Sequence, residues 1–280
     1  MSEINLSTLY IVGTPIGNLQ DTTFRAIQTL QKVDLIAAED TRHTGKLLQY
    51  FQIETPQLSY HQHNEQSRIP ELIEKLKQGK TIALVTDAGM PGISDPGYEL
   101  VKACVEANIS VVPIPGVTAS ITALSASGLP TNKFIFIGFL PTKIKLREEE
   151  LEKLSNSSET IILYESPYRL LQTLEDLAEM LGKDRKIVLA RELTKLHEEF
   201  WRGSVEEAII HYQNYQPKGE FTIVIAGAEA EKIVLSEDTI KEELQELFAQ
   251  GISRSQASRQ LAEKINVSRS KIYQISLKMK

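Results

Sequence analysis

The sequence predicts an α/β protein made of two successive α/β units and a small all-helical C-terminal unit. Three observations support this prediction. Short apolar runs alternate with helical patterns through residues 9–226, and in the first unit this alternation predicts a mostly parallel sheet covered by helices on both faces. Three of these runs end in loops rich in glycine and proline. Residues 239–280 contain three helical patterns and no strand pattern.

The first unit is assigned to residues 1–115, where apolar runs and helical patterns follow one another. The expected strands are Leu9–Val12, Leu35–Ala38, Thr81–Thr86 and Ser110–Val112, and the expected helices are Thr22–Lys32, Leu47–Phe51, Ser67–Lys77 and Tyr98–Ala107. In the first of these helices, Phe24, Ile27 and Leu30 recur at helical spacing. These three side chains are therefore expected to form its buried face.

The second unit is assigned to residues 116–230. The expected helices are Thr118–Ser127, Leu146–Leu154, Tyr168–Leu181 and Val205–Tyr212, and the expected strands are Phe134–Phe139, Thr160–Tyr164, Lys186–Ala190 and Phe221–Ala226. Runs of β-branched residues at Thr160–Leu163 and Phe221–Ile225 suit positions in a sheet. Residues Glu198–Gly203 are expected to pair as a short antiparallel strand.

The third unit is assigned to residues 231–280, after a linker expected at Ala226–Lys232. The expected helices are Thr239–Gln250, Ser253–Lys264 and Ser268–Lys278, with Ser253 and Ser268 as suitable N-caps. The pattern resembles a helix-turn-helix. Arg269 and Lys271 would lie near the start of the recognition helix, where such modules contact nucleic acid. A short helical cap without a role in nucleic-acid binding explains the same pattern.

The charge is unevenly distributed along the chain. The 280 residues carry a net charge of −6, but residues 251–280 contain seven Lys or Arg against one Glu, so the preceding 250 residues carry −12. A basic tail on an acidic body suggests that the tail contacts a polyanion. A solvated helical face is the alternative.

The composition indicates a globular protein of the cytoplasm. The apolar content of 41% is ordinary for such proteins, and no apolar run is long enough to span a bilayer. The N-terminus lacks the basic and apolar stretches of a signal peptide. The single cysteine, Cys104, cannot form an internal disulfide and fits a reducing cytosol. It is expected to be a buried small hydrophobic residue in its helix.

Three loops follow expected strands and are candidates for one binding site. They are Gly13–Asn18, Asp87–Gly97 and Pro113–Ser120. In a parallel sheet, loops at the carboxyl ends of the strands line the ligand crevice. Glycine allows a ligand to approach the backbone closely, and proline stiffens a loop before the ligand arrives. The three loops therefore favour a nucleotide-type site over three unrelated tight connections, which are the alternative.

Several common motifs are absent, and each absence excludes a class of site. Gly79-Lys80-Thr81 lacks the glycine that a phosphate-binding P-loop needs five residues earlier, because that position is Glu74. No G-x-G-x-x-G follows a strand and no G-x-S-x-G is present, which excludes the dinucleotide fingerprint and the common hydrolase elbow. His61 and His63 lack the spacing and the thiols of a zinc site.

The loops, taken with Ala38–Thr44 and Leu163–Arg169, resemble the tetrapyrrole methylase superfamily and, within it, the small-subunit ribosomal RNA methyltransferase I family. The resemblance covers residues 7–228 and then the C-terminal helical unit that part of that family has. It implies two α/β domains with S-adenosylmethionine in the cleft between them, a homodimer, and no metal. It also implies methyl transfer to the ribose 2′-hydroxyl of a cytidine in the decoding region of 16S ribosomal RNA.

The resemblance further implies which residues hold the cofactor. The cofactor is held by loop backbones in this superfamily, which fits the missing glycine fingerprint. The residues carried over by position are Pro15, Asp87, Gly89, Ile93, Thr118, Ala119, Tyr164, Leu193, Gly219 and Thr222. Pro15 is expected to lie beneath the reacting methyl group.

A ribose hydroxyl is a poor nucleophile unless a base removes its proton during attack. Candidate bases follow the second strand, at Glu39, Asp40 and His43, and lie in the second loop, at Asp87 and Asp95. We expect Asp40 or His43 to help deprotonate the hydroxyl. For Glu39 and Asp40 the alternative is a helix N-cap.

Two further residues are expected in the reacting region. Arg42 is expected to steer a phosphate of the RNA, and Asn18 of the first loop is included among the catalytic candidates. Since the acidic body is a poor RNA surface, the basic tail and Lys143, Lys145 and Arg147 are expected to supply further contacts.

Two other functions compete with RNA methylation. The first is a superfamily enzyme that methylates a porphyrin-like ring or a peptide-linked histidine. The second is a non-enzymatic regulator, in which a ligand-sensing α/β body controls DNA binding by the helix-turn-helix.

Overall fold

The computed structural model describes residues 4–214, 217–228, 237–265 and 268–279. The chain forms two compact units, residues 1–227 and 228–280. The boundary expected between residues 115 and 116 lies in the segment that joins strand β5 (Ser110–Ile114) to helix α5 (Ala119–Ser127). The boundary expected at residue 230 and most of the expected linker lie outside the described residues. No helix in the described ranges is long and apolar enough to cross a membrane.

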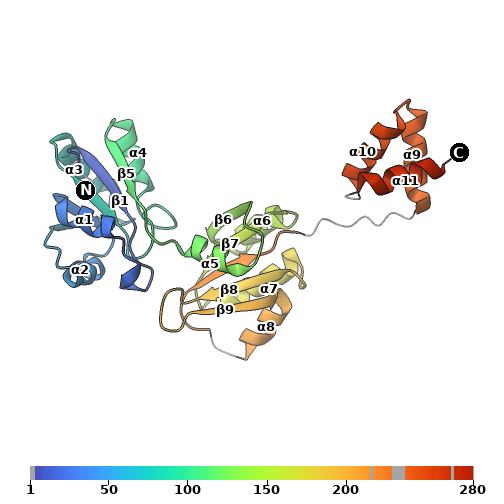
Figure 1. The fold of residues 1–280 in the computed structure, drawn as a ribbon. Helices are drawn as coiled ribbons and strands as arrows, with labels where there is room; N and C mark the ends of the chain where they lie inside the picture. The colour runs from blue at the N-terminus through green and yellow to red at the C-terminus, as the bar shows by residue number, and fades with distance from the viewer. Residues whose placement is uncertain (1–3, 215–216, 229–236, 266–267, 280) are drawn as a thin grey trace. The chain divides into compact units, whose positions relative to one another are not determined.

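The first sheet is entirely parallel and has the strand order β3-β2-β4-β1-β5 (Figure 1). Its strands are β1 (Thr8–Val12), β2 (Leu35–Ala38), β3 (Gln57–Ser59), β4 (Ile82–Val85) and β5 (Ser110–Ile114). The predicted parallel sheet is confirmed. Strand β3 was not predicted, because its three residues are half-buried at the edge of the sheet and show no apolar run.

Helices cover both faces of this sheet, as predicted. They are α1 (Phe24–Lys32), α2 (Thr41–Tyr50), α3 (Glu65–Lys77) and α4 (Tyr98–Glu106), with a 3₁₀ turn η1 (Leu19–Asp21). One apolar core includes residues of α1 and α2, and the other includes residues of α3 and α4, among them the fully buried Cys104. The face predicted for α1 is partly wrong: Ala26, Thr29 and Leu30 are buried, but Phe24 is 87% exposed.

The second sheet is mixed and has the order β6-β7-β10-β8-β9. Its strands are β6 (Phe134–Phe139), β7 (Thr160–Glu165), β8 (Lys186–Arg191), β9 (Glu199–Ser204) and β10 (Phe221–Ile225). Strand β6 runs parallel to β7, and the other pairs are antiparallel, including the predicted pairing of β9. The last strand in the sequence, β10, therefore lies in the middle of the sheet.

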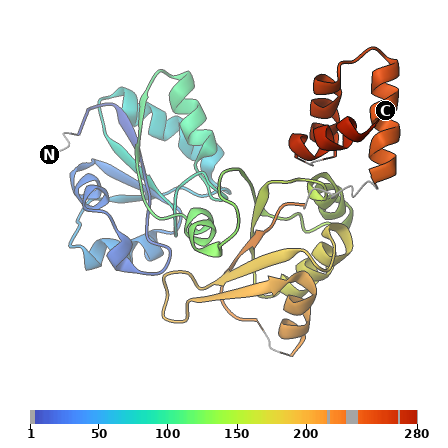
Figure 2. The same cartoon turned by 45° about the vertical axis from the view of Figure 1, so that its right-hand side comes forward.

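Helices also cover both faces of the second sheet. They are α5 (Ala119–Ser127), α6 (Ile144–Leu154), α7 (Leu170–Leu181) and α8 (Val205–Gln213). Helices α6, α7 and α8 lie on one side of the sheet (Figure 2), where leucine-rich faces of α6 and α7 pack with α8 in one core. Helix α5 packs on the opposite face. Arg147 of α6 is buried and forms an ion pair with Asp176, so the prediction that it contacts RNA is wrong. Its neighbours Lys143 and Lys145 are exposed.

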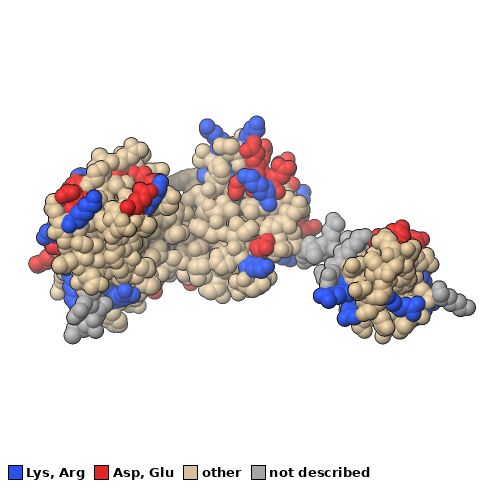
Figure 3. All heavy atoms as spheres, turned by 90° about the horizontal axis from the view of Figure 1, so that it is seen from above, with Lys and Arg blue, Asp and Glu red and all other residues tan. Residues whose placement is uncertain are grey.

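The C-terminal unit contains helices α9 (Glu237–Ala249), α10 (Arg254–Lys264) and α11 (Arg269–Lys278). Its own core joins Ile240 and Leu244 to Leu261, Ile272 and Ile275. Both predicted caps are confirmed, because the side chains of Ser253 and Ser268 accept backbone hydrogen bonds from Gln256 and Lys271. Basic side chains lie on both sides of this unit on the face drawn in Figure 3.

Candidate functional site

The three glycine-rich loops meet at the carboxyl edge of the first sheet. Thr14 and Gly89 exchange backbone hydrogen bonds of 2.9 and 3.1 Å, and the Thr14 hydroxyl donates to the carbonyl of Thr86. A Cβ atom on Gly13 would lie only 2.6 Å from the Cα atom of Gly116. The loops after β1, β4 and β5 thus touch backbone to backbone, and only glycine fits where the first and third loops cross.

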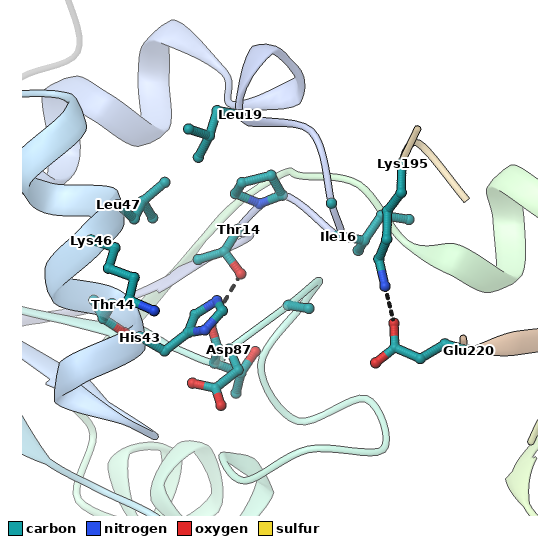
Figure 4. Close-up of a pocket in the computed structure, with 14 residues that line it drawn as sticks. Thr14, Ile16, Leu19, His43, Thr44, Lys46, Leu47, Asp87, Lys195 and Glu220 are labelled. Carbon is teal, nitrogen blue, oxygen red and sulfur yellow. Dashed lines mark hydrogen bonds and ion pairs between the residues drawn. The ribbon is translucent and has the colours of Figure 1, made fainter. Parts of the chain in front are cut away.

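A pocket of about 470 Å³ opens beside these loops, within the size range of small-ligand sites (Figure 4). It is lined by residues of the first loop, η1, helix α2 and the start of the loop after β4, and by two residues from the loops of the second sheet that follow β8 and precede β10. They are Thr14, Pro15, Ile16, Gly17, Leu19, His43, Thr44, Lys46, Leu47, Thr86, Asp87, Ala88, Lys195 and Glu220. Thr86 is buried, and its hydroxyl oxygen has no hydrogen-bond partner in the described structure.

A strained segment holds Lys195 at one side of the pocket. Its ammonium lies 2.9 Å from a Glu192 carboxylate oxygen and 2.8 Å from one of Glu220. Partial burial opposes the charge of Lys195, but the hydrogen bonds to Glu220 and Glu192 outweigh it and raise the pKa of the lysine. Glu192 and Thr194 both have positive φ, of 50° and 65°. Such strain is common at functional sites.

The first loop packs closely against this segment. A Cβ atom on Gly17 would lie 2.4 Å from Cγ of Lys195. Gly219, with φ of 83°, approaches Glu192 so closely that a Cβ atom there would lie 2.4 Å from its Cγ atom. Two glycines therefore allow the segment around Lys195 to lie against the first loop.

The carboxylate of Glu39 lies close to two carboxylates of the second loop, those of Asp87 and Asp95. Glu39 accepts a hydrogen bond from the Asp87 backbone, and Asp87 accepts one from the Asp40 backbone, each at 3.3 Å. Burial, followed by the charges of Glu39 and Asp87, raises the pKa of Asp95 to about 7. Burial is also the main cause that raises the pKa of Glu39. A carboxyl group that titrates near neutral pH is suited to proton transfer.

A second pocket, of about 440 Å³, lies on another side of this carboxylate group. Its lining includes Glu39, Asp95, His61 and His63. The rings of the two histidines are 5.9 Å apart. Within the described part of the chain, no group of three His, Cys, Asp or Glu residues is arranged to hold a metal ion.

Of the four candidate catalytic residues, His43 lines the larger pocket. Asp40 is the N-cap of α2 and accepts hydrogen bonds from the backbone and guanidinium of Arg42, which hold the pKa of Asp40 well below its usual range. Arg42 is 89% exposed in this pair. Asn18 caps η1 by accepting from the Gln20 backbone at 3.0 Å. The capping alternative for Asp40 is thus present in the structure.

The residues expected around the cofactor divide into two sets. Pro15 and Asp87 line the larger pocket, and Gly89 forms the bridge to Thr14. The second set contains the other expected cofactor residues, of which Ile93 is half-exposed, Leu193 and Thr222 are buried, and Thr118 is the N-cap of α5. Its other members are Ala119, Tyr164 and Gly219.

Five members of the second set lie around the start of α5, and one of them, Thr118, is its N-cap. Ala119 packs with the apolar cluster that contains Leu193. The Tyr164 hydroxyl accepts a hydrogen bond from the Ser120 backbone at 3.1 Å, and Thr222 is the cross-strand partner of Tyr164. The Tyr164 ring also contacts two phenylalanine rings of β6, those of Phe136 and Phe139. This region offers an apolar, aromatic wall.

Several residues of the larger pocket were not among the predicted site residues, and they include Lys46, Thr86 and Lys195. Lys46 lies one turn after His43 on α2, and this spacing would have been informative had the helix been predicted from Thr41 instead of Leu47. No sequence pattern predicts that Lys195 lines the pocket, because its position depends on an ion pair with Glu220, which is distant in the sequence.

Comparisons with known proteins place the chain among methylases. The sequence profile described as Tetrapyrrole (Corrin/Porphyrin) Methylases matches residues 8–209. A protein of Synechocystis sp. named ribosomal RNA small subunit methyltransferase I is 58% identical over 98% of this chain and 99% of its own length. A Bacillus subtilis protein of the same name is 47% identical, over 96% and 94%.

Solved structures share the fold at lower identity. The methyltransferase CobJ superposes with a TM-score of 0.60 at 18% identity, over 79% of this chain and 93% of its own. A uroporphyrin-III C-methyltransferase from Thermus thermophilus, solved with S-adenosylhomocysteine, gives 0.55 at 17% identity, over 78% and 96%. These likenesses confirm the predicted fold.

Proposed function

We infer that this chain, which belongs to the tetrapyrrole (corrin/porphyrin) methylase family and to the ribosomal RNA small subunit methyltransferase I group within it, is an S-adenosylmethionine-dependent methyltransferase of small-subunit ribosomal RNA. The observation that carries this proposal is similarity over nearly the whole chain to proteins of that name. We further propose that the acceptor is the ribose 2′-hydroxyl of a cytidine in the decoding region, and that the enzyme acts in the cytoplasm as a homodimer.

The C-terminal unit supports an RNA acceptor over a tetrapyrrole. The alignment with the Synechocystis protein covers 98% of this chain and therefore extends into α10 and α11. The alignments with solved tetrapyrrole-type methyltransferases cover only 78–79%. A basic helical unit shared with the ribosomal relatives suits a polyanionic substrate.

The residues of the site fit S-adenosylmethionine. Bare glycine backbone surrounds the crossing of the loops, and the aromatic wall at Tyr164 suits an adenine ring. The carboxylates of Asp87 and Asp95 suit the cationic sulfonium and ammonium groups. We propose that Pro15, Asp87 and Gly89 hold the cofactor on one side, and that the start of α5, Tyr164, Leu193 and Thr222 hold it on the other.

When bound, the cofactor supplies a methyl group on a positively charged sulfur. The protein has to align the acceptor oxygen with that methyl group and remove the hydroxyl proton as the new O–C bond forms. His43 lines the larger pocket and is therefore the first proposed proton acceptor. Asp95, whose pKa burial raises to about 7, lines the second pocket and is the alternative. Asp40 is a further candidate proton acceptor, although its carboxylate already forms an ion pair with Arg42.

The proposal is tested by incubating the protein with S-adenosylmethionine that carries an isotopically labelled methyl group and with small ribosomal subunits that lack the modification. Nucleoside mass spectrometry and primer extension then locate the label. We expect 2′-O-methylcytidine at one site of 16S ribosomal RNA. Label on a base, or on a porphyrin-type acceptor offered in parallel, would contradict the proposed acceptor.

A further inference from the structure

The larger pocket shares only one edge with the residues proposed to hold the cofactor. Pro15 and Asp87 belong to both sets, but α2 and Leu19 belong to the pocket alone. The cofactor set continues instead toward the start of α5 and Tyr164. The pocket is therefore placed beside the proposed methyl donor, where a second substrate has to enter.

The walls of the pocket combine apolar surface with unused polar groups. Pro15, Leu19 and Leu47 supply apolar surface of the kind on which a ribose or base packs. The buried hydroxyl of Thr86 has no partner in the described structure. Because an unpaired buried polar atom is unfavourable, this hydroxyl would gain from a hydrogen bond with a water or a ligand in the pocket.

The cations of the pocket differ in their partners. Lys195 is neutralised by Glu192 and Glu220. Lys46 is exposed, and no carboxylate of the described residues forms an ion pair with it. Figure 4 shows its ammonium extending from α2 beside His43, on the side of the pocket opposite Lys195. Lys46 is thus a positive charge available to a ligand within an acidic body.

Arg42, on the same helix, is less available. It forms hydrogen bonds of 2.7 and 3.1 Å with the two oxygens of Asp40, so this carboxylate offsets its positive charge. Lys46 has no such carboxylate partner among the described residues. Lysine binds phosphate as a point charge without a fixed geometry.

From this geometry we propose that the pocket between the first loop and α2 receives the acceptor nucleotide, and that Lys46 binds a backbone phosphate of the RNA there. This inference rests on the proposed function. It assigns to Lys46 the phosphate contact that the sequence suggested for Arg42, and it places the nucleotide against Pro15 and Thr86, at the edge shared with the cofactor residues.

The test compares Lys46→Gln with Lys46→Arg and with Lys102→Gln, which changes an exposed lysine of α4 that lines neither pocket. Binding to unmodified small subunits is measured over a range of salt, and S-adenosylmethionine binding is measured by calorimetry. We expect Lys46→Gln to weaken RNA binding on the order of 10-fold, and to reduce the salt slope by about 0.7–0.9. Cofactor affinity should stay within about 2-fold.

Lys46→Arg should restore RNA binding, and Lys102→Gln should behave as the unchanged protein. If Lys46→Gln binds RNA with the unchanged affinity and salt slope while the unchanged protein methylates the subunits, the inference is overturned and the proposed function stands. A protein that neither binds nor methylates the subunits would overturn both.

Discussion

The N-terminal body (residues 1–227) and the C-terminal helical unit (residues 228–280) differ in charge and in packing. The body is acidic, and its loops gather glycines, carboxylates and a pocket at one edge of a parallel sheet. The C-terminal unit has a separate core and carries basic residues on α10 and α11. We infer that the chemistry depends on close packing in the body, whereas RNA affinity depends on positive charges, at Lys46 in the body and on α10 and α11 in the C-terminal unit.

The largest effect is expected from a small volume change in the body. Gly116→Val places side-chain atoms where the loop backbones touch, since even a Cβ atom would lie 2.7 Å from Cα of Gly13. We expect an unfolding free energy lower by about 1–3 kcal/mol, and a methyl-transfer rate lower on the order of 100-fold through misplaced loops. Thermal unfolding and single-turnover transfer measure the two effects.

Gly45→Ala provides the matched control. Gly45 lies inside α2, and a Cβ atom there would meet only Gln57 at an ordinary 3.6 Å. The protein should gain about 0.5–1 kcal/mol of stability from the better helix former. Equal behaviour of the two variants would show that the contact between Gly13 and Gly116 does not matter.

The next effect should appear in the C-terminal unit and only on RNA. Arg269→Gln combined with Lys271→Gln removes two positive charges at the start of α11. We expect RNA affinity to fall on the order of 10-fold and the salt slope to fall by about 1.4–1.8, with cofactor binding unchanged. Filter binding across salt concentrations tests this. Unaltered RNA binding would favour a helical cap without a nucleic-acid role.

Substituting one acidic residue in each region should change the pH dependence of stability differently. The fold raises the pKa of Asp95 to about 7, so its contribution to stability is complete below about pH 4 and is lost as the pH rises through 7. Asp95→Asn should therefore be more stable than the unchanged protein at pH 8, on the order of 1 kcal/mol after allowance for solvent screening, and this advantage should shrink toward pH 4. Denaturant unfolding at several pH values measures it.

Asp238 of α9 gives the opposite case. Its hydrogen bond and ion pair with Lys241 lower the pKa of Asp238, so Asp238→Asn should bring no gain at high pH. If both substitutions gave the same pH dependence, burial of Asp95 beside Glu39 and Asp87 would not explain the effect.

The smallest effect is expected at Arg42. Since its guanidinium is exposed and already paired with Asp40, Arg42→Ala should change RNA affinity by less than about 2-fold. The same binding assay measures it, with Lys46→Gln as the comparison. A larger loss for Arg42→Ala than for Lys46→Gln would return the phosphate contact to Arg42.

The sequence predicted the features that depend on local patterns. The parallel sheet, the gathering of three loops at its edge and the caps at Ser253 and Ser268 follow from apolar periodicity and from residue types at the ends of elements. The error at Phe24 arose because helical spacing alone does not tell which of two overlapping sets of residues faces the sheet.

The features that sequence did not predict depend on contacts between distant segments. Strand β10 lies between β7 and β8, although it follows both in the sequence. Lys195 faces the first loop because Glu220 and Gly17 hold it there, and neither neighbour shares a pattern with it. The raised pKa of Asp95 likewise depends on burial near Glu39, 56 positions earlier in the chain.

The central claim is that the loops after β1, β4 and β5 hold the methyl donor beside, and not inside, the pocket at Lys46. A crystal structure with S-adenosylmethionine tests it most directly. We expect the donor against Asp87, Gly89, Tyr164 and the start of α5, with the space between Leu19 and Lys46 left free. A donor lying between Lys46 and Lys195, or away from the three loops, would contradict the account.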